Sequence, residues 1–169
     1  EVTGFYGITE DIMLLTIIPY KENKLDGHFH VHGNGSYGWH ADKGKVEGLG
    51  DVSVLGRYTF FTTHTIDTTT MVAGLLGIKF STGKTDGKTD DGAEFLDSHL
   101  QLGTGSTDFI LGLSIVHSVQ KLSLSANLLG VIMTEGEAGN TNHQFGNLLN
   151  YDVTAKYRVY PAVSKTYKF

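Results

Sequence analysis

The chain has 169 residues, enough for a single domain spanning residues 1–169, and 40% of them are hydrophobic. Its formal net charge of −5 argues against a nucleic-acid partner, and the lack of cysteine excludes disulfide bonds and thiolate metal sites. No apolar run is long enough for a membrane-spanning helix, and 22 glycines with only 2 prolines favour strands and tight turns.

Apolar and polar residues alternate with a period of two along much of the chain, which predicts β-strands. The first predicted strand, residues 12–20, is apolar on both faces, so the pattern does not fix its orientation. The later strands each place apolar side chains on one face and polar or small ones on the other; they are residues 51–61, 70–81, 108–117, 121–133 and 150–159. A tilted strand needs roughly 9–11 residues to cross a bilayer, which matches these runs.

The connections between the predicted strands alternate in length. Short links are expected at Thr9–Glu10, around residues 64–67, around residues 118–119 and after Pro161. Long polar stretches lie between them, at residues 21–47, 83–104 and 134–144. Outer-membrane barrels have short periplasmic turns and longer extracellular loops, whereas a soluble sandwich has no reason to sort its loops by length. The sequence therefore predicts an all-β, antiparallel transmembrane β-barrel of the outer-membrane type, with seven or eight strands present.

Five segments in a fixed order resemble an outer-membrane transporter family that is named for the meta-cleavage pathway of phenol degradation. The segments are YGITEDIMLLTIIPY (6–20), GLGDVSVLGRYTFF (48–61), GIKFSTGKTD (77–86), LQLGTGSTDFILGLS (100–114) and GNLLNYDVTAKYRV (146–159). The resemblance touches most of the chain and implies an outer-membrane barrel that acts as a channel for small aromatic or other hydrophobic compounds. It brings no catalytic residues. Members of that family are longer, which favours a fragment of a larger barrel, whereas the aromatic residues Tyr167 and Phe169 favour a complete chain. The sequence leaves both hypotheses open.

Seven charged residues lie opposite the apolar stripe of the predicted strands by parity. In a barrel these residues would line the lumen, where a charge can meet water or an opposite charge. One hypothesis is that they set the selectivity of a pore, and the other is that they pair with one another to fill a closed interior. The predicted lumen-lining residues are Asp51, Arg57, Lys79, Asp108, Asp152, Lys156 and Arg158.

A run of alternating histidines, His28, His30 and His32, lies in the first long polar stretch. On an extended backbone the three imidazoles point the same way, about 6–7 Å apart, and imidazole suits zinc, copper or nickel. The run leaves two hypotheses, a histidine-rich surface loop or a site for a divalent metal ion.

Motifs for enzyme chemistry fail on their context. Residues 33–38 spell G-x-G-x-x-G, but they lack the preceding buried strand and following helix of a dinucleotide site. The acidic residues of 84–94 lack the spacing of a calcium-binding loop, and no serine occupies a nucleophile elbow. We therefore expect a protein that is not an enzyme and that needs no cofactor.

The sequence leaves three hypotheses for function. The first is a passive channel or transporter in the bacterial outer membrane, with the lipid bilayer, lipopolysaccharide and a small hydrophobic solute as partners. The second is a structural or adhesive barrel whose long loops bind a partner or a metal. The third is a soluble ligand binder of the lipocalin type. Eight strands enclose only enough room for side chains, so strand number separates the first two hypotheses.

Overall fold

The computed structural model describes residues 1–31 and 37–159, with the backbone alone for residues 28–31 and 37–42. The described chain is all-β, with antiparallel pairing throughout and one short 3-10 helix, η1 (Ser98–Leu100). None of its helices is long and apolar enough to span a membrane. The fold class predicted from the alternating pattern is thus confirmed as all-β and antiparallel.

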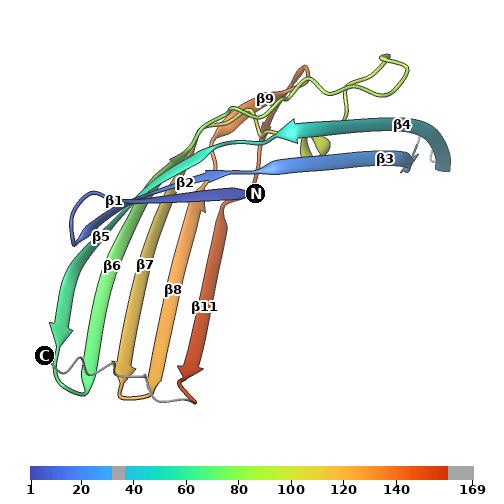
Figure 1. Cartoon of the computed structure of the whole chain (residues 1–169). Helices are drawn as coiled ribbons and strands as arrows, with labels where there is room; N and C mark the ends of the chain where they lie inside the picture. Colours follow the sequence, from blue (N-terminus) through green and yellow to red (C-terminus); the bar gives the residue numbers. More distant parts are fainter. Residues whose placement is uncertain (32–36, 160–169) are drawn as a thin grey trace, which may run out of the picture.

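A single seven-stranded sheet forms most of the molecule (Figure 1). Its order along the sheet is β1-β2-β5-β6-β7-β8-β11, so every strand pairs with the next one along the sheet. Strands β1 and β11 are the two edges, and the described part of the chain does not close the sheet into a barrel. The strands are β1 (Val2–Gly7), β2 (Ile12–Ile18), β5 (Ser53–His64), β6 (Thr68–Lys79), β7 (Asp108–Val119), β8 (Leu122–Ile132) and β11 (Leu148–Tyr157).

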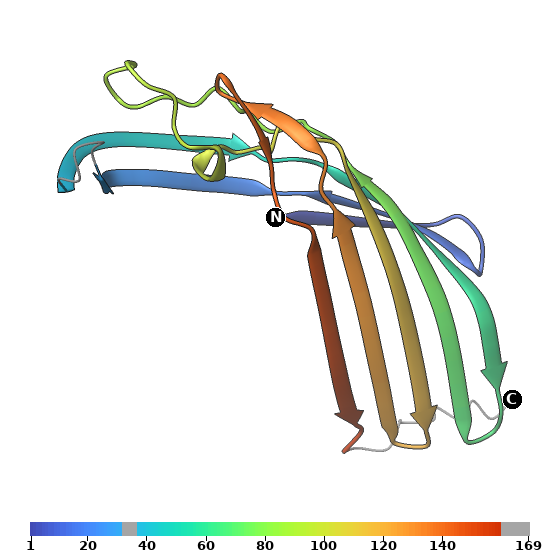
Figure 2. The ribbon, with the colours of Figure 1, turned by 180° about the vertical axis from the view of Figure 1, so that it is seen from behind.

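Two hairpins stand outside this sheet. The longer one pairs β3 (Tyr20–Val31) with β4 (Tyr37–Leu49), with a register shift between Asp26 and His28. The shorter one pairs β9 (Glu135–Ala138) with β10 (Thr141–Gln144). Both views show the long hairpin, β9 and the loop between β6 and β7 gathered at one end of the sheet (Figures 1 and 2). We call this the long-loop end, and the opposite end, with the β5–β6 and β7–β8 turns, the short-turn end.

The strand positions differ little from those predicted, but two of the predicted loops contain ordered hairpins, β3–β4 in residues 21–47 and β9–β10 in residues 134–144. Residues 21–31 and 37–47 are mostly polar, and they lie within β3 and β4. Their few apolar side chains on one face, Leu25 and Val46, pack against Leu96, Leu100 and Leu102 of the β6–β7 loop. This small core is made by residues far apart in sequence, so the pattern of apolar residues within the hairpin does not predict it.

Strand register gives the sheet two chemically different faces. We call one the apolar face; its larger residues are Ile12, Leu14, Val54, Tyr58, Leu76, Ile78, Phe109, Leu111, Leu113, Ile115, Leu122, Leu124, Leu128, Ile132, Leu149, Tyr151, Val153 and Tyr157. We call the other the polar face; its hydrophilic residues are Ser53, Arg57, Thr59, Lys79, Asp108, Ser114, Ser118, Ser123, Ser125, Asn127, Asn150, Asp152, Thr154 and Lys156.

The two faces differ in exposure even where no other element covers them. Along β7, Leu111 and Leu113 of the apolar face are 45% and 41% exposed, whereas Ser114 and Val116 of the polar face are half-buried. Strand β8 shows the same alternation. In a single-layer sheet, side chains crowd on the side toward which the sheet curves. The sheet therefore curves toward its polar face.

Candidate functional site

The most buried charges among the described side chains form one cluster on the polar face at the long-loop end. Lys79, the last residue of β6, is the direct cross-strand partner of Asp108, the first residue of β7. Lys79 Nζ lies 2.5 Å from Asp108 Oδ2 and 3.2 Å from Asp51 Oδ2. The side chain of Lys79 is 15% exposed, and those of Asp51 and Asp108 are 4% and 0% exposed. One ammonium group is thus held between two buried carboxylates.

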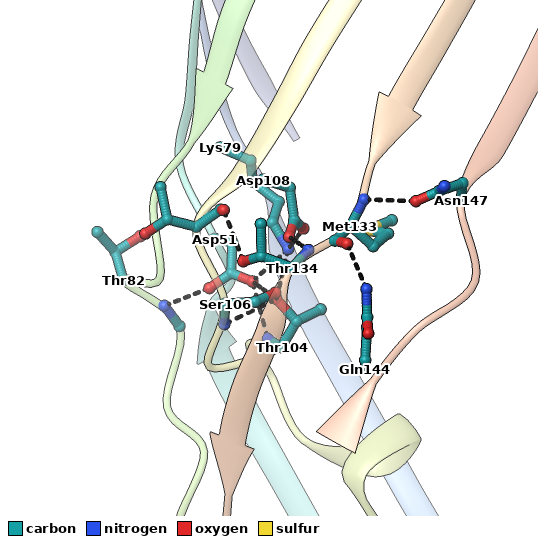
Figure 3. A network of polar contacts seen from close by, with 12 residues as sticks. Asp51, Lys79, Thr82, Thr104, Ser106, Asp108, Met133, Thr134, Gln144 and Asn147 are labelled. Atoms are coloured by element: carbon teal, nitrogen blue, oxygen red, sulfur yellow. Dashed lines mark hydrogen bonds and ion pairs between the residues drawn. The ribbon is translucent and has the colours of Figure 1, made fainter. Parts of the chain in front are cut away.

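Both carboxylates of this cluster also accept hydrogen bonds from loop backbone (Figure 3). Asp51 Oδ1 accepts from the Gly83 amide at 2.9 Å, and Asp51 Oδ2 accepts from the Thr104 amide at 2.8 Å. Asp108 Oδ1 accepts from the Thr134 amide at 2.9 Å. These three amides belong to the start of the β6–β7 loop, its end, and the segment that follows β8.

Hydroxyl groups complete the network. Thr104 Oγ1 donates to Asp51 Oδ2 at 3.0 Å, receives a hydrogen bond from Lys79, and lies 2.8 Å from Ser106 Oγ. Among the described residues, Asp108 Oδ2 has Lys79 as its one polar partner. Because both carboxylates are bonded to Lys79 and to amides of separate loop segments, the arrangement is suited to holding loops in place.

Glycine allows the loop backbone to come this close to the cluster. A Cβ at Gly103 would lie 2.6 Å from both Asp51 Oδ1 and the Gly83 carbonyl oxygen. A Cβ at Gly83 would lie 2.7 Å from the backbone of Gly103. Real Cβ atoms do not approach other heavy atoms so closely, so each position requires hydrogen in place of a side chain.

A second set of contacts holds the β6–β7 loop against the long hairpin. Gln101 is buried, and its amide donates to the Leu96 carbonyl at 2.7 Å while its oxygen accepts from the Gly87 amide at 2.8 Å. Asn23 of β3 donates to the Leu100 carbonyl at 2.9 Å. The hairpin and the loop therefore form one packed layer at the long-loop end, which the Asp51–Lys79–Asp108 cluster fastens to the sheet.

The other predicted lumen-lining residues do not join this cluster. Arg57 lies on the polar face of β5 and donates to Thr59 Oγ1 at 2.9 Å. Asp152 of β11 accepts from Asn127 Nδ2 of β8 at 3.0 Å. Lys156 lies further along the polar face of β11, and Arg158 follows the end of that strand. Parity thus predicted their shared face, but only the register separates the clustered charges from the dispersed ones.

The predicted metal site is not addressed by the structure. His32 lies outside the described residues, and the side chains of His28 and His30 do too. Across the described residues, no group of three or more metal-ligating side chains comes together.

Sequence reasoning missed Thr104, Ser106 and Thr134, which complete the buried cluster. Alternation carries no information about them, since they lie in loops that the cluster draws together from distant positions. One signal was available: the glycines at 103 and 105 in the segment Gly103–Ser106 mark backbone that must approach something closely.

Comparison with curated proteins gives no match, and comparison with solved structures gives none either. The family described as "Putative MetA-pathway of phenol degradation" matches residues 2–168, which is nearly the whole chain. The chain therefore belongs to that family.

Proposed function

We propose that this chain forms all or part of the wall of a β-barrel in the bacterial outer membrane, and that the barrel is a passive channel for small solutes. The observation that carries the proposal is the continuous apolar face. Leu76, Tyr151 and Val153 on that face are 67%, 81% and 77% exposed. Soluble monomers rarely expose contiguous apolar patches larger than a few hundred Å². A face of this size needs a cover, and lipid acyl chains would provide one.

The distribution of connections supports the same proposal. The β5–β6 and β7–β8 turns are short and lie at one end, while the long hairpin and the β6–β7 loop lie at the other (Figure 1). Outer-membrane barrels sort their connections in this way. In this proposal the polar face lines the lumen, and Arg57, Asp152 and Lys156 contact water inside it.

A membrane location places a condition on the two edges of the sheet. Backbone groups in hydrocarbon have no water to bond to, so membrane-embedded edges are not left open. The proposal therefore requires that β1 and β11 be paired in the membrane-embedded protein. A soluble lipocalin-type binder is disfavoured, since it would direct its large apolar side chains into a ligand cavity rather than outward.

The solute class follows from the family alone. Its description refers to phenol degradation, so small aromatic or other hydrophobic compounds are the first to test. Lipopolysaccharide and divalent cations are expected partners of the loops at the outer surface. We assign no catalytic step to this chain.

Purified protein in planar bilayers tests the proposal directly. We expect stepwise conductance, and faster entry of phenol-sized solutes into protein-containing liposomes than into empty ones. Extraction of the protein from cells by salt washing alone, without detergent, would contradict a membrane location. Membrane insertion without any conductance or solute flux would contradict the channel.

A structural or adhesive barrel is the second candidate, and the packed layer at the long-loop end favours it. That layer has its own apolar core of Val46, Leu96 and Leu102, which a simple connecting loop does not need. Replacing residues 20–49 with a short turn distinguishes the two functions. A channel keeps or increases its conductance, whereas an adhesive protein loses binding to its partner cells or surfaces.

A further inference from the structure

The short-turn end of the sheet carries a recess lined by three basic residues. The β7–β8 turn and the end of β11 lie side by side at the bottom of Figure 1. Their residues line a hollow of about 280 Å³. Lys121, Lys156 and Arg158 line it, together with the hydroxyl groups of Ser118 and Ser123. Gln120, Leu122 and Tyr157 are its other lining residues, so none of the described residues that line it is acidic. We propose that this recess binds a small oxyanion, with phosphate as the best-fitting class.

Strand register brings these cations together. The Arg158 amide donates to the Lys121 carbonyl at 2.9 Å, next to the pair formed by Tyr157 and Leu122. Arg158 and Lys121 are therefore direct cross-strand neighbours. Like charges in this relationship are destabilising. An anion bound between Lys121 and Arg158 would offset the repulsion between their positive charges. This is a physical reason for placing two cations opposite each other.

Lys156 adds a third positive charge on the same strand. It pairs with Ser123 across the β8–β11 ladder, so both lie on the polar face. Ser118 Oγ donates to Ser123 Oγ at 2.8 Å, which leaves the Ser123 hydroxyl proton for an acceptor. The recess thus offers an ammonium group and a hydroxyl donor side by side. Both are donors that a phosphate oxygen accepts from.

The ion pairs described by the structure do not include these three cations. Across residues 1–31 and 37–159, no ion pair involves Lys121, Lys156 or Arg158. The nearest acid along the polar face of β11 is Asp152, roughly 13 Å from Lys156 by strand rise, and it bonds to Asn127. The long-loop end differs, because there Lys79 is matched by two carboxylates.

The turn that presents Lys121 is fixed in place. Gln120 has a φ of 50°, and it is the one described residue other than glycine with a positive φ. Its amide donates to the Asp67 carbonyl of the neighbouring β5–β6 turn at 2.7 Å. Left-handed backbone at a residue with a side chain costs free energy and persists where its surroundings hold it. The turn therefore presents Lys121 beside Arg158 in a defined geometry.

The chemistry favours phosphate over a monovalent halide. A guanidinium group binds two phosphate oxygens at once, and the two ammonium groups act as point charges on the remaining oxygens. A soluble phosphate and a phospholipid head group share this chemistry. Because Lys156, Ser118 and Ser123 lie on the polar face, we assign the site to a soluble anion. The site stands whether or not the barrel conducts.

The test uses the whole protein in a maltoside detergent, which contains no phosphate. Equilibrium dialysis with radiolabelled inorganic phosphate should show saturable binding. Added sulfate should displace the phosphate, and a higher salt concentration should weaken its binding. The double variant Lys156→Gln/Arg158→Gln should bind at least roughly tenfold more weakly, as expected for lost charge-assisted hydrogen bonds. Arg158→Lys should retain part of the affinity. Lys84→Gln, at the long-loop end, is the matched control and should bind as the parent does.

The second arm separates the two sources of phosphate. Mixed micelles containing phosphatidylglycerol are passed over the immobilised protein, and retained lipid is measured. Retention that needs Lys156 and Arg158, without binding of inorganic phosphate, overturns the soluble ligand in favour of a lipid head group. Equal phosphate binding by the parent and the double variant overturns the site, and so does the absence of both forms of binding. Circular dichroism confirms that each variant is folded.

Discussion

Lys79 and Asp108 are direct cross-strand partners at the long-loop end of β6 and β7, and their charged groups lie 2.5 Å apart. Asp51, which precedes β5, approaches the same ammonium group at 3.2 Å. Strands β5, β6 and β7 thus meet at one ion-paired cluster. The amides of Gly83, Thr104 and Thr134, in the segments that connect the strands, donate hydrogen bonds to its carboxylate oxygens. Lys79 is thus the cation that both buried carboxylates share.

Replacing Lys79 with methionine should destabilise the protein strongly. The substitution keeps most of the side-chain volume but leaves the buried carboxylates of Asp51 and Asp108 without their cation. Breaking a buried ion pair on one side costs about 3–5 kcal/mol. The measurement is urea unfolding in detergent micelles. Lys84→Met is the control, since Lys84 is 62% exposed and its ion pair with Asp86 should contribute little. Equal unfolding midpoints for the two variants would contradict a stabilising role for the Asp51–Lys79–Asp108 cluster.

Gly103→Ala should destabilise the same region for a steric reason. Its Cβ would lie 2.6 Å from Asp51 Oδ1 and from the Gly83 carbonyl oxygen, and both are held in place. Overpacking of this kind costs typically about 1–3 kcal/mol. Gly130→Ala in β8 is a matched control, because its Cβ would meet nothing nearer than 4.0 Å. Limited proteolysis of the β6–β7 loop measures the effect locally: the Gly103 variant should be cut faster, and the Gly130 variant at the parent's rate.

How far the sequence predicts this fold depends on which contacts are local. The five alternating segments correspond to strands, and Leu76, Leu111, Leu124 and Val153 share a face as their parity predicts. Alternation succeeds here because one face of each strand is uniformly apolar, and a shift of one residue would reverse it. The strand ends are less well predicted; the β7–β8 turn lies at Gln120–Lys121 rather than at 118–119.

The candidate site was predicted only in part, for a related reason. Asp51, Lys79 and Asp108 were placed on one face, but their meeting depends on the pairing of β5, β6 and β7. Period-two patterns do not give the register, that is, which residue of one strand pairs with which residue of the next. The positions of their partners Thr104 and Thr134 depend on the conformation of the loops, which the alternating pattern does not predict. The order of the long hairpin was missed because Val46 and Leu102 meet across more than fifty residues.

Titration of Glu22 offers a test of the exposed face of the long hairpin. The hydrogen bond from Lys24 and the charge of Lys45 hold the pKa of Glu22 below its usual range. A lowered folded-state pKa contributes stability above the unfolded value, and this is lost as pH falls through the folded value. Lys24→Gln should therefore raise the pKa of Glu22, as measured by NMR of the carboxyl carbon. Lys43→Gln, which makes no ion pair with Glu22 among the described contacts, should leave it unchanged.

Leu76→Arg distinguishes a lipid-facing surface from one exposed to water. Leu76 lies mid-strand on the apolar face of β6 and is 67% exposed. An exposed substitution in water usually changes the free energy of unfolding by no more than about 0.5 kcal/mol, whereas arginine near the midplane of a bilayer costs about 2–4 kcal/mol. Reversible unfolding from phospholipid vesicles should therefore show the larger loss for Leu76→Arg. Thr154→Arg, on the polar face of β11, is the control and should cost little, because its side chain would extend into water. A small and equal loss for both variants would mean that the apolar face is not in contact with lipid, and the membrane proposal would then be wrong.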